Sequence, residues 1–164
     1  MTRPAGQVRL RVLVAAPGTG KSTWCRAQGN AAGVVLSTDC ARAEVGEGDD
    51  DRNASDAAFD LVEQRAAEHL DEGRDVTIDA TGARRQDRAR WLALAAAHGA
   101  VPVAVRLRCS LLIALRRNRS RPRQVPALVV FRMWWAVRAL PPERLLAEGF
   151  VHVEDVRTDE DRSG

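Results

Sequence analysis

The side chains best suited to phosphate chemistry are gathered in one segment near the N-terminus, AAPGTGKST at residues 15–23. It holds Lys21, the single lysine of a chain that otherwise uses arginine as its cation. A lysine ammonium is a compact point charge on a flexible stem, whereas a guanidinium is a planar fork, so this exception indicates a position that needs a point charge. Next to two glycines, such a charge is typical of a phosphate-binding turn.

The segments on either side of this turn have the patterns of a strand and a helix. Residues 8–14 alternate and then become apolar with β-branched side chains, which predicts a strand, and residues 21–28 predict the opening of a helix. Strand, glycine-rich turn, Gly-Lys-Ser and helix is the arrangement of a P-loop. Gly18 and Gly20 can take positive φ and turn backbone N–H groups onto a phosphate, which the helix N-terminus also attracts.

This motif predicts a site for a nucleotide and Mg²⁺. Lys21 would bridge the β- and γ-phosphates, and the Ser22 hydroxyl would ligate Mg²⁺. The first glycine of the usual motif is Ala15 here, at a position that closes the strand, where a methyl group is tolerable. The alternative is a chance glycine turn before a helix. The expected nucleotide-binding residues are Pro17, Gly18, Thr19, Gly20, Lys21, Ser22 and Thr23.

A carboxylate and an arginine follow the next candidate strand, at residues 33–37. Because ligands of parallel α/β sheets gather beyond the carboxyl ends of the strands, Asp39 is expected at the same edge as the P-loop. There it could accept a proton from an attacking hydroxyl. Arg42 would lie on the same side if the chain enters a helical turn, and would suit an acceptor with its own anionic group. The alternative is that Asp39 is an ordinary helix N-cap.

A second carboxylate, Asp79, ends the third candidate strand at residues 75–79. Its place after an apolar run is that of the Mg²⁺-associated acid of P-loop enzymes, and the alternative is again a cap. The consecutive acids at residues 49–51 are expected to be solvated, since their spacing fits no calcium loop.

Five arginines crowd residues 116–123, where they repel one another unless anions or water screen them. Beside a nucleotide site they predict a phosphate-clamping lid, and the alternatives are a solvated basic surface or a nonspecific nucleic-acid patch. The preceding helix must stop before Pro122. The next helix, at residues 125–140, carries Trp134 and Trp135, expected mainly in core packing, with base stacking as the alternative.

Composition bounds the class of protein. With 164 residues, 45% apolar and 29% charged, the chain predicts one globular domain. It lacks an apolar stretch of about 18 residues, so no membrane span is expected. Three scattered cysteines argue against a disulfide framework or zinc site and favour a reducing cytoplasm. The net charge is +3, yet residues 88–142 hold no acid, which hints at a polyanionic ligand; arginine as the default cation is the alternative.

Several of these motifs together resemble polynucleotide 5′-kinases, most closely the kinase module of bacterial end-healing kinase–phosphatases. The resemblance covers about residues 8–155. Its segments are GTGKST at 18–23, STDxxR at 37–42, DAT at 79–81, RNxxRxRQV at 117–125 and EGF at 148–150.

The resemblance implies an α/β fold: a P-loop kinase-like parallel sheet of five strands flanked by helices, with a helical arginine-rich lid at about 116–140. The kinase domain would span 1–155, with a disordered tail at 156–164. It implies transfer of the ATP γ-phosphate, with Mg²⁺, to a 5′-hydroxyl end of DNA or RNA. Lys21, Arg117 and Arg121 would bind the nucleotide and take part in catalysis, and Asp39 would be the general base. Asp39, Arg42 and Thr81 would bind the substrate. Ser22 and Asp79 would bind the metal.

Two features depart from the family pattern: Ala15 replaces the first glycine, and Gly82 stands where asparagine often follows D-A-T. Two other functions stay open at this point. One is a small-molecule kinase for a sugar acid, an antibiotic or a nucleotide sugar, in which Arg42 binds a substrate carboxylate. The other is a non-catalytic ATP-dependent nucleic-acid binding module, in which the arginines contact only the backbone.

Overall fold

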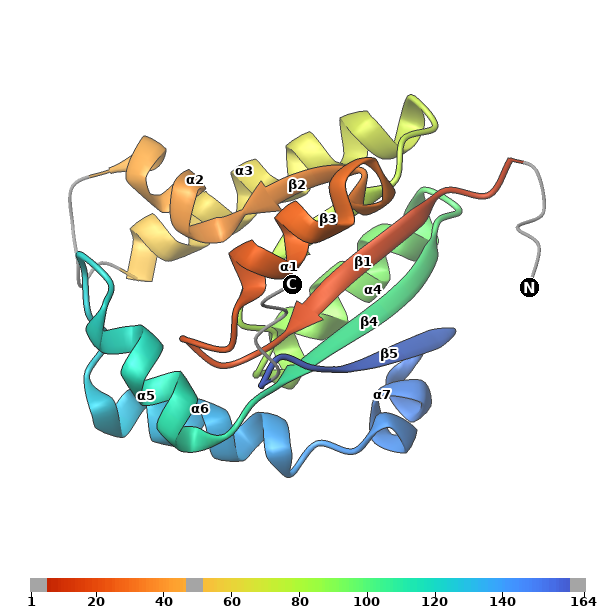
Figure 1. Cartoon of the computed structure of the whole chain (residues 1–164). Helices are drawn as coiled ribbons and strands as arrows, with labels where there is room; N and C mark the ends of the chain where they lie inside the picture. Colours follow the sequence, from red (N-terminus) through yellow and green to blue (C-terminus); the bar gives the residue numbers. More distant parts are fainter. Residues whose placement is uncertain (1–5, 47–51, 160–164) are drawn as a thin grey trace.

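The computed structural model describes residues 6–46 and 52–159, and for residues 52–54 it describes the backbone alone. Five parallel strands form one sheet in the order β2-β3-β1-β4-β5, as the α/β P-loop kinase-like prediction requires (Figure 1). The strands are β1 (Arg9–Val14), β2 (Val34–Ser37), β3 (Val76–Asp79), β4 (Val101–Arg108) and β5 (His152–Arg157).

Helices cover both faces of this sheet and extend beyond it on one side (Figure 1). They are α1 (Lys21–Gln28), the 3₁₀ turn η1 (Gly29–Ala32), α2 (Thr38–Val45), α3 (Arg52–Asp71), α4 (Arg85–Ala97), α5 (Leu111–Arg119), α6 (Ala127–Arg138) and α7 (Pro142–Glu148). The segment expected to be the arginine-rich lid, at about 116–140, contains the end of α5 and all of α6, and we use the name lid for these two helices. The first of them ends at Arg119, before Pro122, as the sequence predicted.

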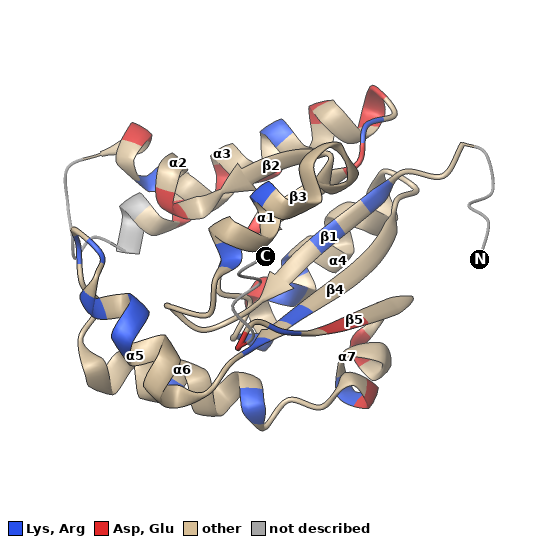
Figure 2. Ribbon diagram, viewed as in Figure 1, with Lys and Arg blue, Asp and Glu red and all other residues tan. Residues whose placement is uncertain are grey.

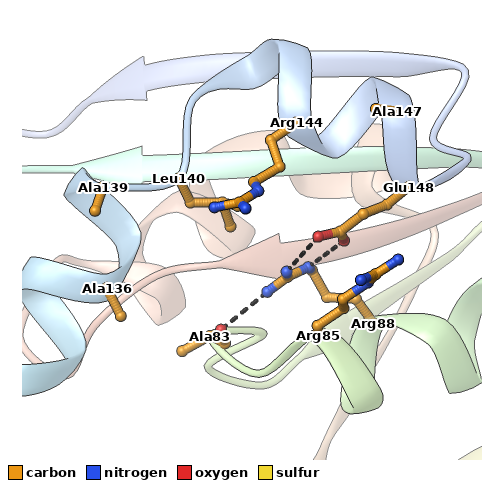
Figure 3. Close-up of a pocket in the computed structure, with 9 residues that line it drawn as sticks. All are labelled: Ala83, Arg85, Arg88, Ala136, Ala139, Leu140, Arg144, Ala147 and Glu148. Atoms are coloured by element: carbon orange, nitrogen blue, oxygen red, sulfur yellow. Dashed lines mark hydrogen bonds and ion pairs between the residues drawn. The ribbon is translucent and has the colours of Figure 1, made fainter.

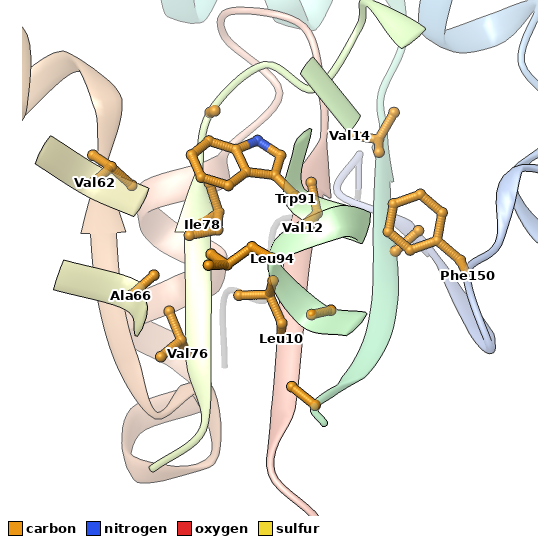
Figure 4. Close-up of a cluster of buried hydrophobic side chains, with 14 of the residues drawn as sticks. Leu10, Val12, Val14, Val62, Ala66, Val76, Ile78, Trp91, Leu94 and Phe150 are labelled. Atoms are coloured by element: carbon orange, nitrogen blue, oxygen red, sulfur yellow. The ribbon is translucent and has the colours of Figure 1, made fainter. Parts of the chain in front are cut away.

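The alternation of residues along β1 divides the core between the two faces of the sheet. Leu10, Val12 and Val14 face one cluster, to which α3, α4 and α7 contribute, with Trp91 fully buried in it (Figure 4). Leu13 faces the opposite way, into a smaller cluster with Trp24 and Cys25 of α1. Burial on both faces of the central strand is typical of a parallel sheet, and it fixes the end of β1, from which the P-loop starts.

The strand register brings the candidate site residues to one edge. Ser37 at the end of β2 is level with Asp79 at the end of β3, and the two strands run parallel to β1. The backbone N–H of Ala15 donates to the carbonyl of Thr81, with an N···O distance of 2.8 Å. The P-loop and the segments after β2 and β3 therefore start from neighbouring points of the sheet.

The end of the chain differs from the prediction. Strand β5 continues to Arg157, and Thr158 and Asp159 make hydrogen bonds with the P-loop and the start of α5, so a domain end at 155 and a disordered tail from 156 are wrong for these residues. Long-range contacts, which no local pattern reveals, order this polar segment. Residues 160–164 and the acids at 49–51 lie outside the described residues.

Of the two tryptophans of α6, Trp135 departs from the expected core packing and Trp134 does not. Trp134 is half-buried beside a small cluster of Cys109, Ala114 and Val130, and its indole N–H donates to the carbonyl of Cys109. Trp135, by contrast, is 58% exposed. Among the helices of the described residues, none is both long and apolar enough to cross a bilayer.

Candidate active site

The P-loop has the backbone conformation that its sequence predicted. Gly18 and Gly20 have φ angles of 80° and 91°, and Gly20 is the N-cap of α1 without a side-chain cap. The first N–H groups of α1 are thus left for an anion, to which the helix dipole adds. In the described part of the chain only glycines have positive φ, so Ala15 takes an ordinary conformation that tolerates its methyl group.

Gly18 has a second reason to be glycine. A Cβ built there would lie 2.2 Å from the carbonyl oxygen of Ala114 in α5. The lid helix therefore packs directly on the P-loop backbone. Gly82 is similar, because its φ is 57° and a Cβ would lie 2.2 Å from the carbonyl oxygen of Leu13. This close approach to β1 accounts for glycine where the related sequences often have asparagine.

Substitution of Gly18 by alanine should lower the free energy of unfolding by about 2–4 kcal/mol, since left-handed strain and overpacking each add roughly 1–3 kcal/mol. Gly29→Ala is the matched control: its φ is also positive, at 52°, but nothing lies within 4 Å of the added Cβ. Urea unfolding of both variants without nucleotide measures the difference. Equal losses would contradict direct packing of α5 on the loop.

Beyond the P-loop lies the acceptor cavity, a hollow of about 570 Å³. Residues from five separate segments line it, and the predicted site residues among them are Pro17, Lys21, Asp39, Arg42, Thr81 and Arg121. Thr38, Arg84, Arg90, Phe59 and Met133 are among the other lining residues. The sequence motifs thus meet in one space, although they are up to about a hundred residues apart in the chain.

Asp39 and Arg42 lie one helical turn apart in α2, with Oδ1 and Nη1 3.7 Å from each other. The N-cap of α2 is Ser37, whose hydroxyl accepts the N–H of Cys40, so the alternative of Asp39 as the N-cap is wrong. The Asp39 side chain is 74% exposed and lines the cavity, which suits a base that must meet a substrate. The Nε of Arg42 is buried without a hydrogen-bond partner in the described residues.

Lys21 and Asp79 share a half-buried environment beside this cavity. Burial lowers the pKa of the Lys21 ammonium, while the carboxylates of Asp79 and Asp39 raise it. Burial likewise raises the pKa of Asp79, against the charge of Lys21. The mutual influence of these groups indicates one compact charged site, the kind of arrangement expected around a phosphoryl group.

A magnesium ion fits this donor set. Ser22 is exposed in the first turn of α1, and Asp79 faces Lys21 from the end of β3, so both offer the hard oxygen ligands that Mg²⁺ prefers. Within residues 6–46 and 52–159 no group of three or more His, Cys, Asp or Glu side chains could hold a metal ion. Such a site would therefore need phosphate oxygens and water to complete the coordination.

The two predicted lid arginines occupy different positions. Arg121 lines the acceptor cavity, and its charge acts on both Lys21 and Asp79. Arg117 donates to the carbonyl of Thr158 at 2.9 Å, and its guanidinium lies 3.5 Å from where a Cβ of Gly20 would be. The Thr158 hydroxyl in turn donates to the Thr19 carbonyl at 2.6 Å. The segment after β5 thus connects lid and P-loop, a role that the sequence did not indicate.

A buried ion pair is hydrogen-bonded to the loop after β3. Arg88 of α4, only 3% exposed, forms a bidentate pair with Glu148 at 2.7 Å for both bonds (Figure 3). Its remaining nitrogen donates to the carbonyls of Gly82 and Ala83, at 2.8 and 2.9 Å. This pair fixes the backbone next to Thr81. Sequence reasoning placed Glu148 in a family motif but missed its partner.

The chain matches the family described as AAA domain (AAA_33) over residues 10–140. No curated protein matches it in sequence. Among solved structures, a protein from Chloroflexus aurantiacus described as a kinase shares 20% identity at a TM-score of 0.67, over 94% of this chain and 87% of that one. A gluconokinase from Sinorhizobium meliloti shares 16% identity at a TM-score of 0.61, over 97% and 86%.

A chain in the Pnkp1/Rnl/Hen1 RNA repair complex shares 18% identity at a TM-score of 0.72. The alignment covers 84% of the present chain but spans 46% of that longer one. At these identities the likeness shows the fold, and the family match covers most of the sequence. The fold is that of a P-loop kinase, and the chain belongs to the AAA domain family.

Proposed function

We propose that this protein is a polynucleotide 5′-hydroxyl kinase, which transfers the γ-phosphoryl group of ATP to a 5′-hydroxyl end of DNA or RNA. The observation that carries the proposal is that Lys21, the Asp39/Arg42 pair and Arg121 line one cavity of about 570 Å³. The structural likeness to a chain of an RNA repair complex supports it.

In the proposed reaction, Asp39 accepts the proton of the 5′-hydroxyl while that oxygen attacks the γ-phosphorus. The bond from the γ-phosphorus to the β–γ bridging oxygen breaks, and ADP leaves with the bond's electrons. Lys21 and Arg121 stabilise the charge on the phosphoryl oxygens. Mg²⁺, held by Ser22 and Asp79, would neutralise charge on the β- and γ-phosphates.

Arg42 would select the acceptor. Its Nη1 lies 3.7 Å from Asp39 Oδ1, so a phosphate held by its guanidinium would be next to the base. In a polynucleotide the phosphate 3′ to the first nucleoside is available for this contact, and a guanidinium fork suits it. Thr81 also lines the cavity and would offer a hydroxyl to the same nucleoside.

The test is incubation of the protein with Mg²⁺, γ-labelled ATP and matched 5′-OH DNA and RNA oligonucleotides. We expect label at the 5′ end of at least one of them. No transfer to any DNA or RNA end would overturn the proposal. Glu154→Gln, an exposed change on β5 away from the cavity, should keep the activity of the unchanged protein.

A second function is a small-molecule kinase for an acceptor such as a sugar acid, which the likeness to a gluconokinase favours. In that case Arg42 would bind a substrate carboxylate instead of a phosphate. The same assay separates the two functions when a panel of metabolites replaces the oligonucleotide. ATP consumption with a metabolite, without label on any oligonucleotide, would select the second.

A further inference from the structure

A second hollow, which we name the lid groove, also reaches the P-loop, through other residues than the acceptor cavity does. It has a volume of about 510 Å³, and Leu112 of α5, Trp134, Trp135 and Arg138 of α6, and Arg108 and Arg157 of the strands are among its lining residues. The P-loop contributes Pro17 and Lys21 to the acceptor cavity but Ala16 and Thr19 to the lid groove. The mechanism proposed above does not use this second hollow.

Four large apolar side chains of the lid are exposed, and two of them line this groove. Leu112 is 80% exposed and Trp135 58%, and both line it. Leu128 and Phe131 are 61% and 43% exposed and lie seven and four residues before Trp135, on the same face of α6. The rings of Phe131, Trp134 and Trp135 form a cluster with centroids 6.3–6.5 Å apart.

The charged residues of α5 and α6 are all arginines. Arg116, Arg119, Arg132 and Arg138 form no ion pair with any described residue, and the guanidinium of Arg138 lies over the Trp134 ring at 5.4 Å. Among the described residues, the acid that lines the groove is Asp159, which pairs with Arg157, and Asp155 pairs with Arg108. Figure 2 shows the basic residues gathered on α5 and the loop that follows it.

We infer that the lid groove and the aromatic face of α6 bind single-stranded nucleic acid. Exposed aromatic rings on helices that also carry arginines without an ion pair to any described residue are the combination that stacks bases and holds phosphates without sequence preference. The inference rests on the proposed function, since this strand is the continuation of an acceptor whose 5′ end is in the acceptor cavity.

Two other occupants fit less well. A second copy of the chain would bring two acid-free lids together, because residues 99–142 contain no Asp or Glu, and like charges at an interface are unfavourable. A membrane surface suits a convex apolar face, whereas Leu112, Trp134 and Trp135 line a hollow with arginines at its edge. A planar base with a phosphate on either side matches both the hollow and the charge.

The test measures binding of a 3′-fluorescein oligonucleotide of about 20 nucleotides that carries a 5′-phosphate and so cannot be an acceptor, as DNA and as RNA. We expect Trp135→Ala and Phe131→Ala to weaken binding about 10-fold each, since stacking on one aromatic ring contributes about 1–3 kcal/mol per base. Leu146→Ala, which removes a 47% exposed apolar side chain on α7, is the matched control and should bind as the unchanged protein does. Thermal unfolding by circular dichroism checks that each variant is folded.

Equal binding by Trp135→Ala, Phe131→Ala and the unchanged protein would overturn the inference, as would binding to phosphatidylserine vesicles but not to the oligonucleotide. Failure of the proposed function has a different signature. In that case no acceptor is phosphorylated, yet the binding difference between Trp135→Ala and Leu146→Ala persists. If both hold, Trp135→Ala should raise the KM for a long acceptor and leave the KM for a nucleoside 3′-phosphate unchanged.

Discussion

Asp39→Asn should reduce phosphoryl transfer by about 10²–10⁴-fold, the range that general base catalysis contributes. Asparagine keeps the size and polarity of the side chain but cannot accept the proton of the acceptor hydroxyl. Because Asp39 is 74% exposed and Ser37 provides the cap of α2, the substitution should leave the stability of the helix unchanged. Single-turnover kinetics with labelled ATP and a 5′-OH oligonucleotide measure the rate of the chemical step.

The nucleotide site offers the control for this variant. Asp39 lies outside the P-loop, so Asp39→Asn should retain ATP affinity within about threefold. The substitution removes one charge that acts on Lys21 through space and no contact with the nucleotide. Lys21→Met should instead lose nucleotide affinity together with transfer. Retention of at least half of the transfer rate in Asp39→Asn would show that another group, or none, accepts the proton.

Much of the fold could be predicted because its signals are local. The apolar runs before the P-loop and at residues 101–107 are strands in the structure. The helix before Pro122 ends at Arg119, because proline cannot continue a helix. The acceptor cavity could be anticipated from the rule that ligands gather beyond the carboxyl ends of parallel strands. That rule placed Asp39 and the P-loop residue Lys21 in one region without any knowledge of tertiary contacts, and Thr81, which the resemblance indicated, lines the same cavity.

Other features depend on contacts that no window of sequence contains. Ser37 and Asp39 are both good capping residues two positions apart, and only the point at which α2 starts decides between them. Trp135 lies in a helix that is apolar on more than one face, so the pattern cannot say which face stays uncovered. Thr158 is a polar residue after the last strand, and its bond to Thr19 spans 139 positions.

The buried pair of Arg88 and Glu148 was missed for the same reason, and its removal should have the largest effect on stability. Arg88→Met should lower the free energy of unfolding by about 3–5 kcal/mol, because it leaves a buried carboxylate without its partner. The Glu148 side chain is only 9% exposed, so water cannot replace the lost bonds. Arg85→Met is the matched control, since Arg85 is also on α4 and lines the same small hollow as Arg88 and Glu148, of about 480 Å³, but is exposed (Figure 3).

The double variant Arg88→Met/Glu148→Leu decides whether charge or shape is responsible. It removes both charged side chains, so its loss of unfolding free energy should be smaller than the sum of the losses of the two single variants. The coupling energy should be about 2 kcal/mol or more. It should still be less stable than the unchanged protein, because the carbonyls of Gly82 and Ala83 lose the donor that Arg88 supplied. Additive losses in urea unfolding would mean that the two side chains stabilise the loop after β3 independently, and that the pair is not what holds Thr81 at the cavity.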